Sequence, residues 1–473
     1  MIKKQYISIK EAKENELEEV RAQVLKDSNH RTSYHISPPI GLLNDPNGLV
    51  FDGENYHIFY QWYPYDSTHG MKHWYHLITK DFIKYEESTI LIPEESFEAQ
   101  GCYSGGAMTI GEDLLCFYTG NTRQGEAYER VSYQNLAVFD KNNYKLKEKV
   151  CLLNTPEGYT EHFRDPKPYI HDGKVRFVCV GQRENETGSA IIFEYSHEEK
   201  KASLVGELEI ENTDEDNVFM WECPDLFKVG DKDVFVWCPQ GLEAKGRKYN
   251  NIYNCTYAIG KLDDTKFSNE SYDELDKGFD FYAPQTFFGT DETIMYGWVG
   301  LPCAEYPSDE YKWQGALTLP RVLTIENNKL IQKPHESIYK NIDSEAKEEV
   351  CGTKEISIDL KHSYINAKVE KNLEITLFNN GGKGLILKYN NSIFSIDRSQ
   401  TIESDFMREY GSVREVEIKK LNDLEIFIDN SIIEIYLNKG EEVLTSRFFI
   451  ENKNNVVTSD IKLEISPVKS IVL

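Results

Sequence analysis

Five segments of the chain follow the same plan at a spacing of about sixty residues. Each opens with polar residues or proline, passes a turn containing Gly or Asp, and continues as an apolar run. Repeats of this length hold about four strands each, which is typical of the blades of a β-propeller. The alternative is an irregular β-sandwich with accidental echoes, and we predict the propeller. The positions that mark the repeats, 59, 61, 57 and 62 residues apart, are Asp45, Ser104, Asp165, Glu222 and Pro284.

The rest of the chain predicts an all-β protein with a short helical start. Residues 9–25 read as one charged helix with a rough apolar stripe, after which helical periodicity gives way to aromatic and β-branched runs. Residues 424–440 alternate apolar and polar side chains around an Asp-Asn-Ser turn, as a hairpin does. We therefore predict a helical extension over residues 1–33, a five-bladed β-propeller over 34–335 and a β-sandwich over 345–473.

The composition excludes several classes of partner. A net charge of −26 over 473 residues argues against nucleic acid and anionic membranes, whose phosphates repel an acidic surface. No apolar run reaches the length of a signal peptide or of a membrane span. The nine cysteines are scattered singly, as expected for free thiols in a reducing compartment. We predict a cytoplasmic protein, and the sequence leaves open whether it is a monomer or a homodimer.

Three acids stand at the heads of predicted blades: Asp45 in NDPNG, Asp165 in RDP and Glu222 in ECPD. Taken singly, each has a structural reading, because Asp and Asn beside Pro or Gly commonly form turns. Blades of a propeller converge on one central channel, however, so acids at equivalent positions meet there. Cleavage of a glycoside needs one carboxylate at the anomeric carbon and one carboxylic acid at the departing oxygen. Arg164 directly precedes Asp165, and we expect its charge to keep that carboxylate ionised.

Longer motifs around these acids resemble glycoside hydrolase family 32, the invertases, inulinases and sucrose-6-phosphate hydrolases. They run in the family's order from about His35 to Arg321, with weaker echoes, DNSIIEIYLN and TSRFF, near the C-terminus. The resemblance implies a five-bladed propeller with a β-sandwich, a retaining reaction on fructosyl bonds, and no cofactor. We also expect no metal, because no ligand-spaced histidines accompany the acids. The motifs are HISPPIGLLNDPNG, FYQWYP, HGMKHWYH, GCYSGGA, YTEHFRDPK, MWECPDLF, GFDFYAPQTF and YGWVGLP.

Carried over by position, the resemblance gives the three acids separate roles. Asp45 becomes the nucleophile, Asp165 the stabiliser of the transition state, and Glu222 the general acid and base. Two positions depart from the common pattern, with Tyr75 in place of a glycine and Gly106 in place of a serine. The further positions that the resemblance places around the fructosyl pocket are Asn44, Gln61, Trp74, Tyr103, Ser104, Arg164 and Trp298.

The expected substrate is a small sugar or sugar phosphate, and the resemblance favours the phosphorylated form. A chain this acidic needs local cations to bind a phosphate, and Lys72 and His73 in HGMKHWYH are the candidates. We therefore expect hydrolysis of sucrose-6-phosphate, of sucrose, or of both. The same three acids would serve a fructan exo-hydrolase or a fructosyltransferase. A non-catalytic carbohydrate-binding propeller is the alternative of a different class.

Overall fold

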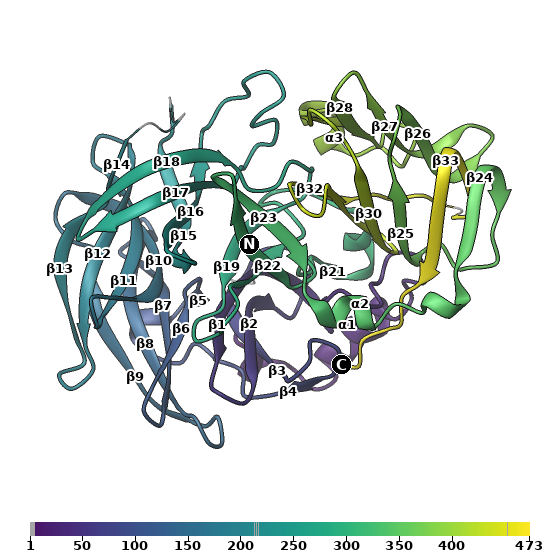
Figure 1. Ribbon diagram of the computed structural model, residues 1–473. Coiled ribbons are helices and arrows are strands. Elements are labelled where there is room, and N and C mark those ends of the chain that lie inside the picture. Colours follow the sequence, from purple (N-terminus) through teal and green to yellow (C-terminus); the bar gives the residue numbers. More distant parts are fainter. Residues whose placement is uncertain (1–4, 212, 214, 216, 452) are drawn as a thin grey trace.

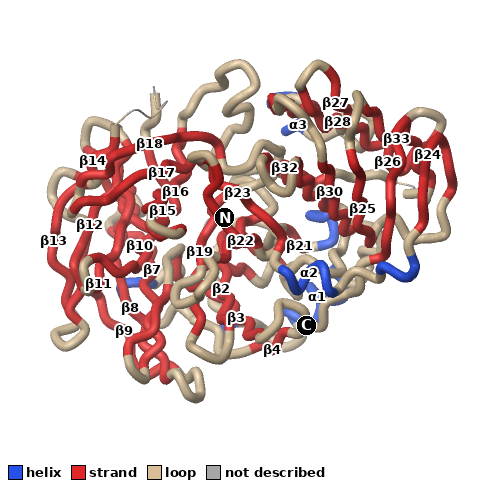
Figure 2. Tube along the Cα trace, in the orientation of Figure 1, coloured by secondary structure: helices blue, strands red, loops and turns tan. Residues whose placement is uncertain are grey.

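The computed structural model describes residues 5–211, 213, 215, 217–451 and 453–473, so the first four residues of the predicted N-terminal extension lie outside it. Strands dominate the chain, and its helices are few and short (Figure 1, Figure 2). Five separate sheets are formed by the strands up to residue 334, and the strands that follow form a further, larger assembly. The predicted fold, a five-bladed β-propeller followed by a C-terminal β-sandwich, is confirmed.

Each blade is a sheet in which the main strands pair antiparallel with their neighbours in the sequence. The strands of blade I are β1 Gly41–Phe51, β2 Tyr56–Tyr63, β3 His73–Thr79 and β4 Tyr85–Glu87, and those of blade II are β5 Cys102–Tyr103, β6 Ala107–Ile110, β7 Asp113–Gln124, β8 Glu129–Asp140 and β9 Leu146–Asn154. Blade III holds β10 Tyr159–His171, β11 Lys174–Arg183, β12 Gly188–Ser196 and β13 Lys201–Glu207. Blade IV holds β14 Glu209–Ile210, β15 Met220–Val229, β16 Lys232–Gln240, β17 Thr256–Asp263 and β18 Lys266–Glu274, and blade V holds β19 Tyr282–Thr286, β20 Ile294–Trp298, β22 Arg321–Glu326 and β23 Lys329–Pro334.

The inner strands of four blades share an irregularity at a proline. In β1, β10, β15 and β19 one extra residue is inserted relative to the neighbouring strand, next to an X-Pro pair. Proline has no N–H for the ladder, so it is tolerated at such bulges. In blade II the equivalent residue is Gly105, where an added Cβ would lie 1.9 Å from Phe117 O. The four prolines are Pro46, Pro166, Pro224 and Pro284.

These prolines give the true alignment of the blades. Asp45 and Asp165 each directly precede the shared proline, whereas Cys223 occupies that place in blade IV. Glu222 stands one residue earlier, at the place that Arg164 holds in blade III. The prediction that all three acids share one phase of the repeat is therefore right for the two aspartates and wrong for Glu222.

A ring of hydrogen bonds between neighbouring blades surrounds the propeller axis at these bulges. Every pair of adjacent blades contributes to it, including blades V and I, which β21 Trp313–Gln314 also joins by pairing parallel to β1. The ring holds the inner strands at the same level along the propeller axis, so residues at equivalent positions face the same channel. Its bonds run from Gly48 N to Gly105 O (3.1 Å), Gly106 N to Pro166 O (2.8 Å), Cys223 N to Asp165 Oδ2 (3.0 Å), Thr286 N to Asp225 Oδ2 (2.6 Å) and Leu49 N to Gln285 Oε1 (3.1 Å).

The N-terminal segment differs from the single helix predicted over residues 9–25. A 3-10 turn covers Ile9–Glu11, and helix α1 covers only Glu16–Val24. Ser8 and Glu11 close a capping box on the turn, and Asn15 takes a left-handed conformation with φ 66° before α1, which breaks the helix in two. The remaining helices are α2 Glu336–Lys340 and α3 Asp405–Tyr410, with further 3-10 turns at Ser96–Glu98, Pro307–Tyr311 and Ser344–Ala346. Among the residues that the structure describes, no helix combines the length and apolar character needed to cross a membrane.

The C-terminal assembly is a sandwich in which one long strand, β33, belongs to both layers. Its first half pairs with β26 and its second half with β25, while β24 pairs along it. Buried aliphatic side chains such as Ile375, Leu387, Ile426 and Ile435 form its core. The predicted hairpin turns at Asn430–Ser431, between Asp429 and Ile432. The strands are β24 Glu348–Glu355, β25 His362–Lys368, β26 Leu373–Asn380, β27 Lys383–Asn390, β28 Ile393–Asp397, β29 Val413–Glu417, β30 Asp423–Asp429, β31 Ile432–Leu437, β32 Glu442–Arg447 and β33 Val456–Pro467.

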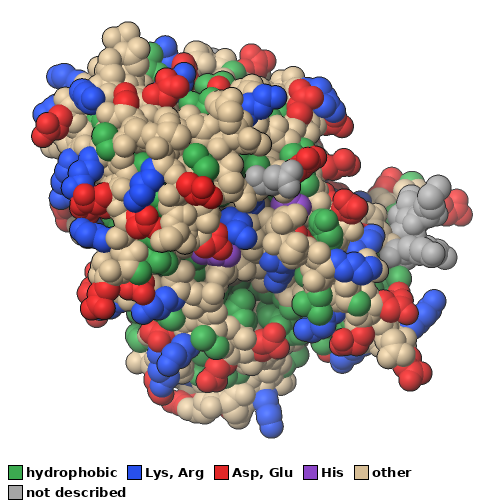
Figure 3. Space-filling view, turned by 90° about the vertical axis from the view of Figure 1, so that its right-hand side faces the viewer, with side chains coloured by type: hydrophobic (Ala, Val, Ile, Leu, Met, Phe, Trp, Pro, Cys, Tyr) green, Lys and Arg blue, Asp and Glu red, His purple; other side chains and the backbone are tan. Residues whose placement is uncertain are grey.

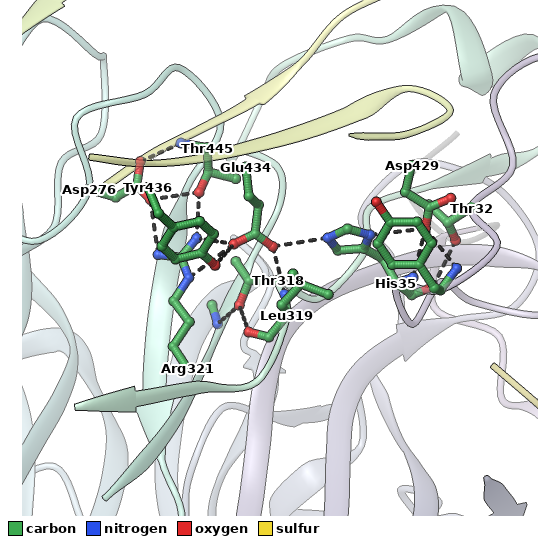
Figure 4. A network of polar contacts seen from close by, with 12 residues as sticks. Thr32, His35, Asp276, Thr318, Leu319, Arg321, Asp429, Glu434, Tyr436 and Thr445 are labelled. Atoms are coloured by element: carbon green, nitrogen blue, oxygen red, sulfur yellow. Dashed lines mark hydrogen bonds and ion pairs between the residues drawn. The ribbon is translucent and has the colours of Figure 1, made fainter. Parts of the chain in front are cut away.

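A buried polar network joins the propeller to the sandwich (Figure 4). His35, just before blade I, lies between Asp429 and Glu434 of the sandwich, at 2.9 Å from each. Arg321 of blade V donates to the same Glu434 at 2.6 Å and to Asp276 at 3.1 Å. Burial acts to lower the pKa of His35, but its hydrogen bonds to the two carboxylates outweigh this and raise the pKa to about 9. The imidazole is therefore charged at neutral pH.

Substitution His35→Gln should destabilise the protein in a way that depends on pH. Because the folded-state pKa of about 9 exceeds the ordinary value of about 6.5, the stabilisation is complete below pH ~6.5 and is lost as pH rises through 9. We expect the deficit in unfolding free energy to be on the order of 3 kcal/mol at pH 6 and to shrink toward pH 9.5. Thermal unfolding measured across this range checks it, with His197→Gln on the surface as control. A deficit that does not vary with pH contradicts a charged His35.

Candidate active site

A narrow pocket lies on the propeller axis and draws residues from all five blades. Asp45, Ser104, Asp165, Cys223 and Pro284 all line it. Four of these five are the positions that marked the repeat in the sequence, and the fifth is the neighbour of Glu222. The predicted convergence of blade heads therefore takes place, and it brings residues more than a hundred positions apart into one site.

Asp45 is held by a set of short polar side chains. Ser104 Oγ donates to Oδ2, and Asn44 Nδ2 donates to Oδ1 at 3.1 Å. Gln61 Nε2 lies 3.4 Å from Oδ2 and also donates to Ser104 Oγ. Burial raises the pKa of Asp45; the hydrogen bonds from Ser104 and Asn44 oppose the rise, and the charge of Glu222 adds to it. The carboxylate is thus fixed in orientation and poorly hydrated.

Lys72 is buried next to the side chains that hold Asp45, and it is not a solvent-exposed lysine in a loop. It is 3% exposed, and its Nζ donates to Asn44 Oδ1 at 2.6 Å. This bond turns the Asn44 amide so that its nitrogen faces both Asp45 and Gln61, to which it donates at 2.8 Å. Burial lowers the pKa of Lys72 to about 7, although the charge of Asp45 acts to raise it. Lys72 therefore belongs to the surroundings of Asp45.

Asp165 lies across the pocket in a left-handed backbone conformation with φ 65°. Its N–H donates to Thr119 Oγ1 at 2.9 Å, and its carboxylate accepts the backbone N–H of Cys223 at 3.0 Å. A non-glycine residue in this region is strained, and strain of this kind gathers at functional sites. Burial raises the pKa of Asp165 to about 7, and Arg164 lowers it less than burial raises it.

Glu222 has the strongest contacts to cations and donors. Arg164 donates to Oε1 through Nε at 3.2 Å and Nη2 at 2.7 Å. Tyr282 and Gln240 both donate to Oε2 at 2.5 Å. Burial acts to raise the pKa of Glu222, but Arg164, Tyr282 and Gln240 outweigh it, and the pKa falls below its ordinary value.

The expectation that Arg164 keeps Asp165 ionised is therefore wrong. The guanidinium lies 4.0 Å from Asp165 Oδ2 and makes its close ion pair with Glu222. Because Arg164 pairs closely with Glu222 and not with Asp165, the pKa of Asp165 exceeds that of Glu222 in the unliganded pocket. A proton held within the trio at neutral pH resides on Asp165 more than on Glu222.

The aromatic and histidine candidates lie around the pocket in different ways. Trp74 is fully buried and donates from Nε1 to Tyr103 O at 3.1 Å, so it supports the backbone there and presents no ring face to a sugar. Trp298 is also fully buried, 6.5 Å from the Tyr282 ring. Tyr103 is partly exposed at the head of blade II. The two ring nitrogens of His73 contact Met71 O and the Ile9 N–H, each at 3.1 Å, and its side chain does not line the pocket.

Three contacts of the acids escaped the sequence reasoning. Gln240 and Thr119 stand at strand positions with no motif of their own, and only the strand register brings them to Glu222 and Asp165. Cys223 contributes its backbone N–H, which side-chain chemistry does not reveal. Its place before a proline shared by the blades is the signal that could have found it.

Comparison with known families matches both parts of the chain. The model of the glycosyl hydrolases family 32 N-terminal domain matches residues 35–334, and that of the family 32 C-terminal part matches residues 326–467. A sucrose-6-phosphate hydrolase of Bacillus subtilis (strain 168) is 36% identical over 93% of this chain and 93% of that protein. One of Vibrio alginolyticus is 34% identical over 99% of this chain and 97% of that protein.

Solved structures show the same similarity. The sucrose-6-phosphate hydrolase from Lactobacillus gasseri superposes with a TM-score of 0.92 at 31% identity, covering 100% of both chains. The Bombyx mori GH32 beta-fructofuranosidase BmSUC1 superposes with a TM-score of 0.81 at 30% identity, covering 98% of this chain and 100% of that one.

Asp165→Asn should stabilise the protein above neutral pH. Because the folded-state pKa of about 7 exceeds the ordinary value of about 3.9, the native state loses stability as pH rises from 4 to 7. Asparagine keeps the acceptor for Cys223 N–H without a charge, so we expect a gain on the order of 4 kcal/mol at pH 8 that vanishes near pH 4. Denaturant unfolding at both pH values measures this, with exposed Asp231→Asn as control. A variant that is less stable than wild type at pH 8 shows that Asp165 is not a destabilised carboxylate.

Proposed function

The chain belongs to glycosyl hydrolase family 32, and from this we propose that it hydrolyses the β-fructofuranosyl bond of sucrose-6-phosphate and of sucrose. The observation that carries the proposal is that Asp45 and Asp165 line one pocket and that Glu222, beside the pocket residue Cys223, interacts electrostatically with both. Each of the three acids has a different set of partners. Two carboxyl groups on opposite sides of a glycosidic bond are what a double displacement requires, and we propose a retaining reaction with a fructosyl-enzyme intermediate.

Asp45 is the proposed nucleophile. Ser104, Asn44 and Gln61 fix its carboxylate, so it reaches the anomeric carbon without reorganisation at the moment of attack. Poor hydration, which raises its pKa, also leaves the ionised form more reactive toward carbon. We propose that the buried Lys72 contributes positive potential that keeps Asp45 ionised.

Glu222 is the proposed acid and base. Its contacts with Arg164 and Tyr282 favour the ionised form, which is the form that accepts a proton from water in the second step. In the first step it must hold a proton for the leaving glucosyl oxygen. A bound sugar removes water from the pocket and thereby raises the pKa of Glu222, which favours that protonation.

Asp165 is the proposed stabiliser of the transition state. Positive charge develops on the fructosyl ring as the bond breaks, and a carboxylate close by gains in interaction energy at that moment. With a pKa of about 7 in the free pocket, Asp165 is ionised in part at neutral pH, and the ionised form is the one that stabilises this charge. The Cys223 N–H holds its Oδ2, and the remaining acceptor capacity of the carboxylate is available to orient sugar hydroxyls.

The substrate class follows the relatives, several of which are named sucrose-6-phosphate hydrolases. A fructan exo-hydrolase or a fructosyltransferase would use the same trio, and product analysis at high sucrose separates transfer from hydrolysis. We propose a cytoplasmic location, because a sugar phosphate carries charge that keeps it from crossing a membrane unaided.

Asp45→Asn tests the nucleophile. We expect kcat for sucrose to fall by ~10⁴-fold or more, because an amide neither attacks carbon nor forms the ester intermediate. Asp45 is partly exposed in a pocket, so the variant should keep its fold, which circular dichroism checks. The exposed Asp231→Asn serves as control. A folded Asp45→Asn protein with substantial turnover would falsify the assignment.

Glu222→Ala and Asp165→Ala should respond differently to added azide. Removing Glu222 leaves Arg164, Tyr282 and Gln240 around an empty site that suits a small anion, so azide should restore part of the turnover. A fructoside with an acidic leaving group should also be cleaved, since it needs no proton. Neither rescue is expected for Asp165→Ala, which lacks charge stabilisation. Equal rescue of both variants means that the two roles are wrongly assigned.

A further inference from the structure

Two arginines face each other across the hairpin that extends from blade II. Arg123 on β7 and Arg130 on β8 are direct partners in the antiparallel register, so their side chains leave the same face of the sheet. Like charges directly opposite each other destabilise a sheet. Such a pair needs a compensating anion.

No carboxylate in the described part of the chain supplies that anion. Among the residues that the structure describes, neither arginine forms an ion pair, and Arg123 Nε is buried without an acceptor. Most other arginines have a carboxylate within 4.0 Å, as Arg176 and Arg183 do at 2.7 Å. Arg123 and Arg130 therefore belong to the minority of described arginines without an ion pair, in a chain with a net charge of −26.

Further positive charge lies beside the pair. Burial lowers the pKa of Arg130, and the charges of Arg164 and Arg123 lower it further. Partial burial, with Arg164 and Arg130 close by, likewise lowers the pKa of His162 to about 4. His162 Nδ1 accepts a hydrogen bond from Arg164 at 3.2 Å, so the imidazole is neutral and adds a polar group to the cluster.

The cluster stands beside the catalytic pocket and not on a remote surface. Strand β7 carries Thr119, which contacts Asp165, and runs four residues further to Arg123. Tyr103, at the pocket, interacts electrostatically with both Arg123 and Arg130. Arg164 links the two regions, because its guanidinium also holds Glu222, the proposed acid at the leaving glucosyl group.

We propose that Arg123 and Arg130 bind the phosphate of the sugar phosphate, at the glucosyl end of the pocket. This rests on the proposed function and adds the residues that select the phosphorylated substrate. Two guanidinium groups match the charge and the oxygen geometry of a phosphate dianion. Acidic and basic side chains are interspersed on the face seen in Figure 3, so attraction of an anion depends on local cations of this kind.

The arginine pair replaces the cations that the sequence suggested for this task. Lys72 is buried against Asn44 beside Asp45, at the fructosyl end. His73 has both ring nitrogens occupied by the backbone. Neither is placed to meet a group on the glucosyl side.

The test is the double variant Arg123→Gln, Arg130→Gln, assayed with sucrose-6-phosphate and with sucrose. We expect kcat/KM for the phosphorylated sugar to fall about 10- to 100-fold and kcat/KM for sucrose to change less than about two-fold. The matched control is Arg247→Gln, Arg408→Gln, which removes the same charge from exposed ion pairs elsewhere. Because the pair has no carboxylate partner, the melting temperature should not fall. An equal change for both sugars, or none for either, overturns the proposal and leaves the hydrolase assignment intact.

A binding measurement separates this proposal from the catalytic one. Asp45→Asn protein should bind glucose 6-phosphate more tightly than glucose in calorimetry, and adding the two arginine substitutions should remove the difference. This readout needs no turnover, so it holds even if the wild type cleaves neither sugar and the proposed function fails. Glucose 6-phosphate binding that survives loss of both arginines refutes the phosphate site.

Discussion

The repulsion among three carboxylates, two lining one narrow pocket and the third beside it, is the constraint around which the centre of the propeller is arranged. The charge of Glu222 raises the pKa of both Asp45 and Asp165, and the charge of Asp45 raises the pKa of Asp165 further. One cation, Arg164, makes the close ion pair with Glu222, while short polar side chains and a backbone N–H hold the two aspartates. The pKa of Glu222 is consequently lowered whereas those of the two aspartates are raised, and a site whose acids differ in pKa can assign them different chemical tasks.

This arrangement requires that the blades do not slide past one another along the propeller axis. The bulges that carry the acids also prevent this sliding. The bulges that hold the acids also hold the hydrogen bonds between adjacent blades. The sandwich contributes further contacts where blade V meets blade I and closes the ring of blades. His35 precedes blade I and Arg321 belongs to blade V, and both bind Glu434 of the sandwich. A buried ionic network therefore fastens the two blades between which the propeller would open, so the sandwich supports the geometry of a pocket that it does not line.

The sequence predicted the elements that repeat and missed those that depend on register. The spacing of the blade heads was sufficient to place Asp45 and Asp165 together. Glu222 lies one residue out of phase, and only the shared prolines show it. The partner of Arg164 was misjudged because adjacency in sequence was taken for contact, whereas a bulge turns the two side chains apart. Lys72 could not be recognised as buried, since a lysine in a polar motif usually reaches water.

Arg164 connects the arginine pair, Arg123 and Arg130, with the relative pKa values of the acids. Its charge keeps the pKa of Glu222 low in the unliganded pocket, and Arg123 and Arg130 add positive potential nearby. A phosphate dianion bound between those two arginines would cancel their potential and place negative charge on the same side of Glu222. Its pKa would then rise, because a nearby negative charge disfavours the ionised form of a carboxyl group. Binding of the phosphorylated substrate would thus favour the protonated form of the acid that cleaves it, with the proton taken from solvent before the pocket closes on the sugar, and the same anion would leave with the glucosyl product. Glu222 would return to the ionised state that the second step needs as a base.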